Sequence, residues 1–322
     1  MIKSKTVLVL GAGASVPYSF PTGAELVRKI REHAEAPSPI CFQSLTRNEQ
    51  VRTIETKLET LANELRLAQP DSIDEFLERR PELAETGKVI LAIILLNAER
   101  VSEKHMWDDK TSGHWYKLLK ARLVGPIDSL IKHKLKIISF NYDRSLEYYL
   151  YKTLQPYYAN EPSEVFVDKI KQIPFLHIYG SLGPLQWQST KKAIPYGPNK
   201  PGSSQIISAS ENVNIMHEGS NDKVQQNFKK AQEWLKWSHN IFFLGFGFHQ
   251  DNVRRLGLVD SISFQKTAKA TCLGLPLTNK NSVSWSWTEQ TEEGAKVIKR
   301  AVEFPDPEAD CYTFLHDYVI LQ

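Results

Sequence analysis

The stretch Thr6-Val7-Leu8-Val9-Leu10, followed directly by Gly11-Ala12-Gly13-Ala14-Ser15, decides the fold of this chain. Its first half is a run of β-branched and aliphatic residues, which is typical of a fully buried strand. The glycines then turn the chain, and Thr22-Gly23-Ala24-Glu25 has the spacing of a capping box that begins a helix. A strand, a glycine-rich turn and a helix in this order predict the opening of a nucleotide-binding α/β fold.

Four later apolar segments, each followed by a glycine or a polar residue, predict further strands. They are residues 136–140 (KIISF), 175–179 (FLHIY), 241–244 (IFFL) and 269–273 (KATCL). Helical patterns separate them, so we expect a doubly wound, mostly parallel sheet with a ligand crevice at the carboxyl ends of its strands. Residues 181–220 are rich in Pro, Gly, Ser and Asn and predict long loops.

Residues 36–132 predict a helical insertion within a single domain of residues 1–322. Leu58, Leu61 and Leu65 recur at helical spacing, and Ser72-Ile73-Asp74-Glu75 offers a second capping box. Residues 89–96 are apolar on every side of a helix, which predicts that this helix is deeply buried.

Composition narrows the classes of function. Lys and Arg number 40 against 37 Asp and Glu, so the formal net charge is only +3 and we expect no direct nucleic-acid binding. Cys41, Cys272 and Cys311 lie far apart in no CxxC pair, which excludes a four-cysteine zinc site within one chain. The longest apolar run, residues 89–96, is too short to span a bilayer. We therefore expect a cytoplasmic protein that uses no metal and does not enter a membrane.

The glycine-rich turns predict places where a ligand approaches the backbone. Gly11 and Gly13 would bring the chain within hydrogen-bond distance of a pyrophosphate. The third glycine position of GxGxxG is Val16, so the alternative is a turn that serves only packing. Gly245 and Gly247 follow another predicted strand and would admit a ribose or a phosphate in the same way.

Polar side chains at the ends of two predicted strands are the candidate catalytic groups. An amide at Asn141 can hold a ribose hydroxyl or a water, whereas the alternative is that Asn141 or Asp143 only caps the next helix. His177 and Tyr179 lie two residues apart on one predicted strand, so we expect their side chains on the same face. His177 is the better general base because imidazole titrates near neutrality; its alternative role is that of a hydrogen-bonded core residue.

In combination, these motifs resemble the sirtuin-type NAD-binding family over residues 7–252. The resemblance rests on GAGAS with Pro21-Thr22-Gly23, on SFNYD with Glu147 downstream, on His177-Ile178-Tyr179-Gly180-Ser181, and on LGFGF followed by Asp251. It is closest to the bacterial sirtuin-like proteins of antiphage defence, which hydrolyse NAD. It therefore implies a sirtuin-type sheet and an NAD glycohydrolase that releases nicotinamide and ADP-ribose.

The resemblance also implies residue roles and partners. Asn141 would position the attacking water or the ribose, and His177 or Tyr179 would be the base. The implied NAD-binding residues are Gly11, Ala12, Gly13, Ser15, Thr22, Asp143, Gly245, Gly247 and Asp251. NAD is then the substrate, and the implied assembly is a homo-oligomer gated by a partner such as a DNA-translocating ATPase, an Argonaute or a phage protein.

Two departures from the family leave alternatives open. The family usually carries histidine at the position of Tyr179, so either His177 supplies the imidazole or the base is lost. Loss of the base would leave a regulatory domain that binds NAD or ADP-ribose without cleaving it. The family's deacetylases carry a four-cysteine zinc module that this chain cannot build, which leaves a zinc-free protein deacylase as the third alternative.

Overall fold

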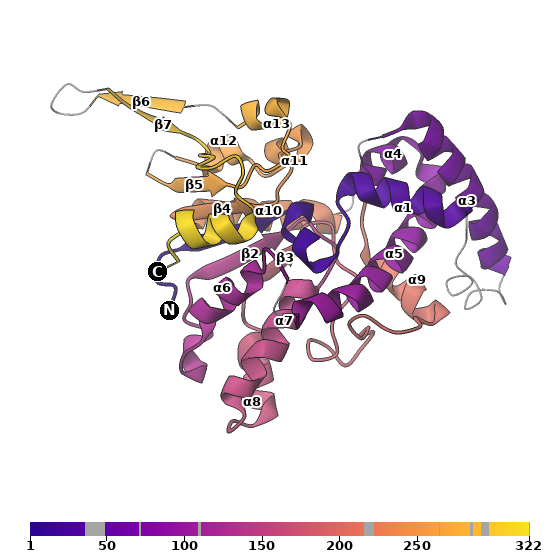
Figure 1. The fold of residues 1–322 in the computed structure, drawn as a ribbon, viewed down its shortest axis with the longest axis horizontal. Helices are drawn as coiled ribbons and strands as arrows, with labels where there is room; N and C mark the ends of the chain where they lie inside the picture. Colours follow the sequence, from indigo (N-terminus) through magenta and orange to yellow (C-terminus); the bar gives the residue numbers. More distant parts are fainter. Residues whose placement is uncertain are drawn as a thin grey trace.

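The computed structural model describes residues 1–35, 49–70, 72–108, 111–215, 222–263, 265–283, 286–290 and 296–321. At its centre lies a sheet of five parallel strands in the order β3-β2-β1-β4-β5 (Figure 1). The strands are β1 (Thr6–Leu10), β2 (Leu135–Ser139), β3 (Phe175–His177), β4 (Asn240–Leu244) and β5 (Thr267–Ala270). The prediction of an α/β fold with a parallel sheet is confirmed, and the strand order is Rossmann-like.

The central strand, β1, determines where the loops leave the sheet. Leu10 pairs with Ser139 of β2 and with Leu244 of β4, so these three strands end level with one another. The residues that follow them therefore emerge side by side at one edge of the sheet. This is the carboxyl edge, where parallel α/β sheets bind their ligands.

Two strands end earlier than the sequence predicts. β3 ends at His177 rather than at Tyr179, because the chain turns there: the N–H of Gly180 donates to the carbonyl of His177 at 3.4 Å, and Gly180 has φ +81°. β5 ends at Ala270 rather than at residue 273, because its partner β4 turns at Gly245, where φ is +56°.

Helices cover both faces of the sheet. Lys136 is the register partner of Val7, and its ammonium lies 4.2 Å from the ring centroid of Trp237 on α10 (Asp222–Trp237). Phe242 is the register partner of Leu8, one position further along, and therefore points to the opposite face. There it contacts Phe314 of the C-terminal segment, which comprises α14 (Cys311–Thr313) and the π-helical turn Phe314–Tyr318.

A cluster of helices gathers beside the sheet, on the right of Figure 1. Its members are α1 (Gly23–Glu35), α3 (Glu49–Ala68), α4 (Ile73–Arg79), α5 (Ala84–Met106) and α9 (Ser203–Asn212). Residues 89–96 of α5 are at most 8% exposed, as their apolar composition predicts. Of the insertion expected at residues 36–132, residues 36–48 lie outside the described residues, and α6 (Trp115–Leu123) packs against α7 (Ser145–Leu154) rather than within the cluster.

The prediction of loops throughout residues 181–220 is wrong for α9. This helix begins after Gly202, whose N–H donates to the side chain of Gln205 at 3.0 Å, and it buries Ile206 and Ala209. It packs against α5, which lies far away in the sequence. Its few apolar residues form a helix because α5 supplies the surface that covers them.

The remaining elements complete the fold. They are α8 (Ser163–Ile170), α11 (Gln250–Arg255), α12 (Leu258–Ser261), α13 (Leu277–Asn281), five 3₁₀ turns (Ala12–Ala14, Val16–Tyr18, Pro81–Leu83, Ile127–Ser129 and Gln155–Tyr158) and the antiparallel hairpin of β6 (Ser286–Gln290) and β7 (Lys296–Arg300). The hairpin projects at the upper left of Figure 1. Within the described part of the chain, no helix combines the length and the apolar character needed to cross a membrane.

Candidate functional site

The side chain of Asn141 is fixed at the carboxyl edge of β1 and β2. Its Nδ2 donates to the carbonyl of Gly11 at 2.9 Å and to Oγ of Ser15 at 3.0 Å. Because a carbonyl oxygen only accepts, the contact with Gly11 also determines which way the amide is oriented. Oδ1 contacts no hydrogen-bond donor among the described residues, and it is not a buried atom. Asn141 therefore presents a free acceptor at this edge.

The carboxylate of Asp143 fixes the hydroxyl of Ser15. Ser15 Oγ donates to Oδ2 of Asp143 at 2.9 Å, while the N–H and the hydroxyl of Ser145 both donate to Oδ1. The hydroxyl of Tyr116, on α6, lies 2.7 Å from Oγ of Ser145. Burial raises the pKa of the Asp143 carboxyl, and these donors oppose the rise. Asp143 thus accepts from the first N–H of α7 as well as from Ser15, and its role in binding NAD stays a prediction.

His177 has both ring nitrogens occupied. Nδ1 lies 2.9 Å from the carbonyl oxygen of Asn141, and Nε2 lies 2.7 Å from Oε1 of Glu147 on α7. Burial works to lower the pKa of His177, but the charge and hydrogen bond of Glu147, together with the Asn141 carbonyl, outweigh it and raise that pKa. The Asn141 carbonyl requires a proton on Nδ1, and the Glu147 carboxylate favours one on Nε2. In this arrangement His177 has no free lone pair with which to accept a proton from a substrate.

Tyr179 does not share a face with His177, contrary to the expectation from sequence. The strand ends at His177, so the alternation of side chains does not continue to Tyr179. Its hydroxyl instead donates to Oδ1 of Asn252 on α11 at 2.6 Å, beneath the guanidinium of Arg255. Burial raises the pKa of the Tyr179 phenol far above neutrality, so this residue does not accept protons at neutral pH.

The glycines of the two turns pack against each other. A Cβ added to Gly11 would lie 2.4 Å from the carbonyl oxygen of Gly245. A Cβ added to Gly13 would lie 2.8 Å from the Cα of Gly245. In the first turn, the N–H groups of four residues donate to backbone carbonyls, namely those of Gly11, Gly13, Ala14 and Ser15. The N–H of Ala12 is not among these donors. A pyrophosphate therefore cannot occupy the space beside the α-carbons of Gly11 and Gly13, because the backbone of Gly245 and Phe246 fills it.

Three residues expected to bind NAD lie outside this network. Thr22 caps α1, with its N–H donating to Glu25 Oε2 at 2.7 Å. Asp251 is exposed and pairs with Arg254 on the same helix at 2.8 Å. The carbonyl of Gly247 accepts from Asn279 at 2.7 Å. The network brings together Gly11, Ser15, Asn141, Asp143 and His177, and it leaves Thr22, Tyr179, Gly247 and Asp251 apart.

Several members of the site were not among the residues singled out from sequence. Glu147 appears there only as part of a motif, and it lies in the first turn of α7. Tyr116 and Ser145 carried no sequence signal, because Tyr116 lies on another element and Ser145 stands at an ordinary helix start.

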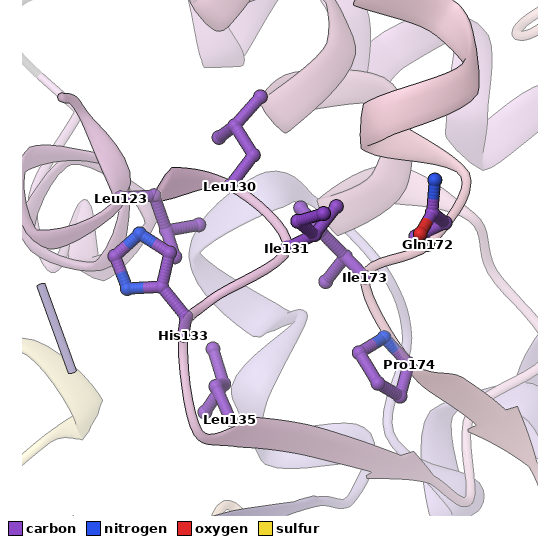
Figure 2. A pocket seen from close by; sticks show the side chains of 8 residues that line it. All are labelled: Leu123, Leu130, Ile131, His133, Leu135, Gln172, Ile173 and Pro174. Carbon is purple, nitrogen blue, oxygen red and sulfur yellow. The ribbon is translucent and has the colours of Figure 1, made fainter. Parts of the chain in front are cut away.

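A cavity of about 50 Å³ lies at the opposite edge of the sheet, and Figure 2 shows the residues around it. Leu135 begins β2 and Pro174 immediately precedes β3, so the cavity lies at the amino ends of the strands. A volume of this size holds one or a few waters and cannot hold a dinucleotide.

Among the described residues, no group of three or more His, Cys, Asp or Glu side chains could hold a metal ion. No model of a known protein family and no curated protein matches this chain.

Proposed function

We propose that this protein binds NAD at the carboxyl edge of β1, β2 and β3 and hydrolyses the bond between nicotinamide and ribose. The observation that carries the proposal is Oδ1 of Asn141, which accepts from no donor among the described residues while the two bonds of Nδ2 hold the side chain. An acceptor fixed at this edge suits a ribose hydroxyl or an attacking water. The proposal includes a sirtuin-type sheet with residues 36–132 as a helical insertion, as the sequence motifs imply.

The reaction asks little of a general base. The bond from ribose C1′ to the nicotinamide nitrogen breaks with its electron pair moving to the pyridinium, which leaves neutral nicotinamide and an oxocarbenium-like ribose. Water then forms a bond to C1′ and releases its proton to solvent, giving ADP-ribose. The carboxylate of Asp143 supplies negative potential close to Asn141, which favours positive charge on the ribose, whereas the charge of Glu147 is balanced by the doubly protonated His177. Asn141 orients the water.

In this proposal His177 is a positioning residue. Its bond to the carbonyl of Asn141 fixes the backbone that carries the Asn141 side chain, and Glu147 fixes the ring. A histidine used in this way need not touch the substrate. Its role differs from the base expected from sequence.

The test is to incubate the purified protein with NAD and to measure nicotinamide and ADP-ribose by chromatography. Asn141→Ala is expected to lower the rate by about 100-fold or more, because a fixed polar contact to the reacting group is lost. Asn141→Asp keeps an acceptor but turns a carboxylate oxygen against the carbonyl of Gly11, so it is expected to fail as well. Asn160→Ala, at an exposed turn, is the matched control and is expected to keep full activity. Full activity in Asn141→Ala would reject the proposed role.

The second candidate is a domain that binds NAD or ADP-ribose without cleaving it. Two observations favour this second candidate. Both ring nitrogens of His177 are hydrogen-bonded, and the hydroxyl of Tyr179 donates to Asn252, so neither residue is placed to act as a general base. Calorimetric titration separates the two candidates: binding without nicotinamide release supports the second, and release that depends on Asn141 supports the first. From the family resemblance we further propose that turnover depletes NAD in antiphage defence and awaits assembly or a partner.

A further inference from the structure

The segments that lead into the five strands of the sheet are rich in lysine. They are residues 1–5, 131–134, 171–174, 236–239 and 265–266, which precede β1, β2, β3, β4 and β5 in that order. None of these segments contains Asp, Glu or Arg, whereas together they contain the lysines Lys3, Lys5, Lys132, Lys134, Lys171, Lys236 and Lys266. Over the whole chain Lys and Arg number 40 against 37 Asp and Glu, so the overall composition does not show this local concentration.

The parallel topology brings these segments together at the amino edge of the sheet. Thr6 pairs with Leu135 and with Asn240, and Asn240 pairs with Thr267, so four of the strands begin level with one another. Adjacent strands lie about 4.8 Å apart, so the edge from β3 to β5 is about 19 Å long.

Backbone hydrogen bonds also join the segments to one another. The N–H of Lys134 donates to the carbonyl of Ile2 at 2.9 Å, and the N–H of His239 donates to the carbonyl of Lys5 at 2.8 Å. The lysines therefore stand on one continuous edge rather than on separate loops.

Two of these lysines are engaged within the chain. The ammonium of Lys5 lies 5.7 Å from the ring centroid of Trp237, and that of Lys266 donates to the carbonyls of Leu235 and Lys236 at 2.6 and 2.9 Å. The other five are exposed, and none of them forms an ion pair with another described residue. We call these five the lysine row: Lys3, Lys132, Lys134, Lys171 and Lys236.

The acidic residues nearest to these segments in the sequence reduce the charge of the edge without cancelling it. They are Asp128, Asp168 and Glu233. Asp128 lies within electrostatic range of Lys132, but it is paired with Lys169 at 2.8 Å. Glu233 lies within range of Lys136 in β2, where burial and the charges of neighbouring lysines outweigh it and lower the pKa of the Lys136 ammonium. The edge thus keeps an excess of positive charge.

A nucleic-acid backbone is the partner that suits this edge. Duplex DNA carries one negative charge per about 1.7 Å of its axis, so an edge of about 19 Å spans about eleven of them. Lysine ammonium groups act as point charges on phosphates, whereas the arginine forks that read guanine are absent from these segments. An anionic membrane suits it less, because the exposed large apolar side chains in these segments are only Met1 and Ile131.

We propose that the amino edge of the sheet binds the phosphate backbone of nucleic acid through the lysine row, without reading its sequence. This proposal goes beyond NAD hydrolysis and does not rest on it. The formal net charge of +3 led us to expect no direct nucleic-acid binding, but a net charge does not report where the charges lie. NAD carries two phosphates and neutralises at most two of these lysines, so the edge favours a polymer over NAD.

The test follows the fluorescence anisotropy of a labelled 20-base-pair DNA duplex as the purified protein is added, in 50 to 200 mM KCl. Five phosphate contacts predict a slope of about −4.5 for log K against log[salt], so affinity should fall about 500-fold over this range. Combining Lys132→Gln, Lys134→Gln and Lys171→Gln leaves two contacts and should flatten the slope to about −1.8. A duplex of unrelated sequence should bind wild type within about threefold.

The matched control combines Lys191→Gln, Lys192→Gln and Lys200→Gln, which removes the same charge from exposed positions outside these segments. It should keep the wild-type slope, and both triple variants should melt at the wild-type temperature because every substituted side chain is exposed. Equal weakening in the two triple variants, or no binding in 50 mM KCl, would overturn the proposal. Binding to vesicles of phosphatidylserine and phosphatidylcholine without binding to the duplex would overturn it too.

This proposal and the proposed function fail separately. Asn141→Ala should bind the duplex as wild type does, and millimolar NAD should not displace the duplex, because NAD is expected at the carboxyl edge. Duplex binding by a protein that releases no nicotinamide would reject the hydrolysis and keep the lysine row. Displacement of the duplex by NAD would assign the lysine row to NAD and overturn the proposal made here.

Discussion

At the scale of single residues, the glycine turns at the carboxyl edge are explained by contact between two backbones. The N–H of Gly13 donates to the carbonyl of Gly245 at 3.0 Å, and a Cβ on Gly245 would lie 2.1 Å from the nitrogen of Ala14. No side chain fits between these turns. The glycines therefore place Ser15 within reach of Asn141 and Asp143, and the proposed ligand would contact the side chains that they position rather than their α-carbons.

Gly245→Ala tests this explanation. Its positive φ alone penalises alanine by about 1–2 kcal/mol, and the clash with Gly13 and Ala14 adds about 1–3 kcal/mol of overpacking. Gly274→Ala is the matched control, because Gly274 has φ +69° but nothing within 4 Å of its Cβ position. Chemical denaturation should show a clearly larger loss of unfolding free energy for Gly245→Ala. Equal losses in the two variants would mean that the turns can separate without cost.

The residues that meet at the site were predicted from the sequence more accurately than the hydrogen bonds that they form. Ser15, Asn141, Asp143 and His177 are polar residues at or beside the ends of apolar strands, and parallel strands that end level must bring them together. The bond from His177 to Glu147 was not predictable from strand spacing, because it joins a strand to a helix face. For that reason His177 was expected to be a general base from the sequence, whereas its bond to Glu147 leads us to propose a positioning role.

At the scale of elements, the segments with a strong local pattern were predicted and those that depend on distant contacts were not. β1, β2 and β4 consist mainly of aliphatic and aromatic residues, and all three were located to within one residue. The end of β3 depends on a turn that is also held by Asn214, and α9 depends on α5. Contacts of this kind are not visible in a hydrophobic pattern.

The ion pair of Arg144 and Glu99 joins α5, the start of α7 and the loop of residues 183–197. Both side chains are at most 1% exposed, and the guanidinium also donates to the carbonyls of Gly183, Ile194 and Pro195 at 2.8–3.2 Å. Burial raises the pKa of Glu99, while Arg144 opposes the rise. The pair fixes the helical cluster against the sheet, immediately next to Asp143.

Arg144→Met should therefore destabilise the fold by about 3–5 kcal/mol, because it leaves Glu99 buried without its partner. Combining Arg144→Met with Glu99→Met should recover much of the loss, since no charge then remains in the interior. Arg254→Met breaks an exposed pair with Asp251 and should cost less than about 1 kcal/mol. Unfolding in urea measures all three, and a loss for Arg144→Met as small as for Arg254→Met would contradict the assignment.

At the scale of the whole molecule, the two edges of the sheet differ in chemistry. The carboxyl edge carries the Asn141 network, which lies on the loops that follow β1 and β2 and at the end of β3. The amino edge carries the small cavity of Figure 2, lined mainly by apolar side chains such as Leu130 and Ile173. We therefore expect a polar, ribose-containing ligand of dinucleotide size to bind at the first edge rather than at the second.

Hydrogen exchange with NAD present tests this assignment across the chain. Residues 11–19, 141–147 and 177–183 should exchange more slowly when NAD binds, because they carry or flank the network. Residues 130–135 and 172–174, around the cavity, should be unaffected, and they serve as an internal control within the same sample. Asn141→Ala, measured at the same NAD concentration, should lose the protection at the carboxyl edge. Slower exchange confined to the amino edge would place the ligand at the wrong end of the strands for the proposed chemistry.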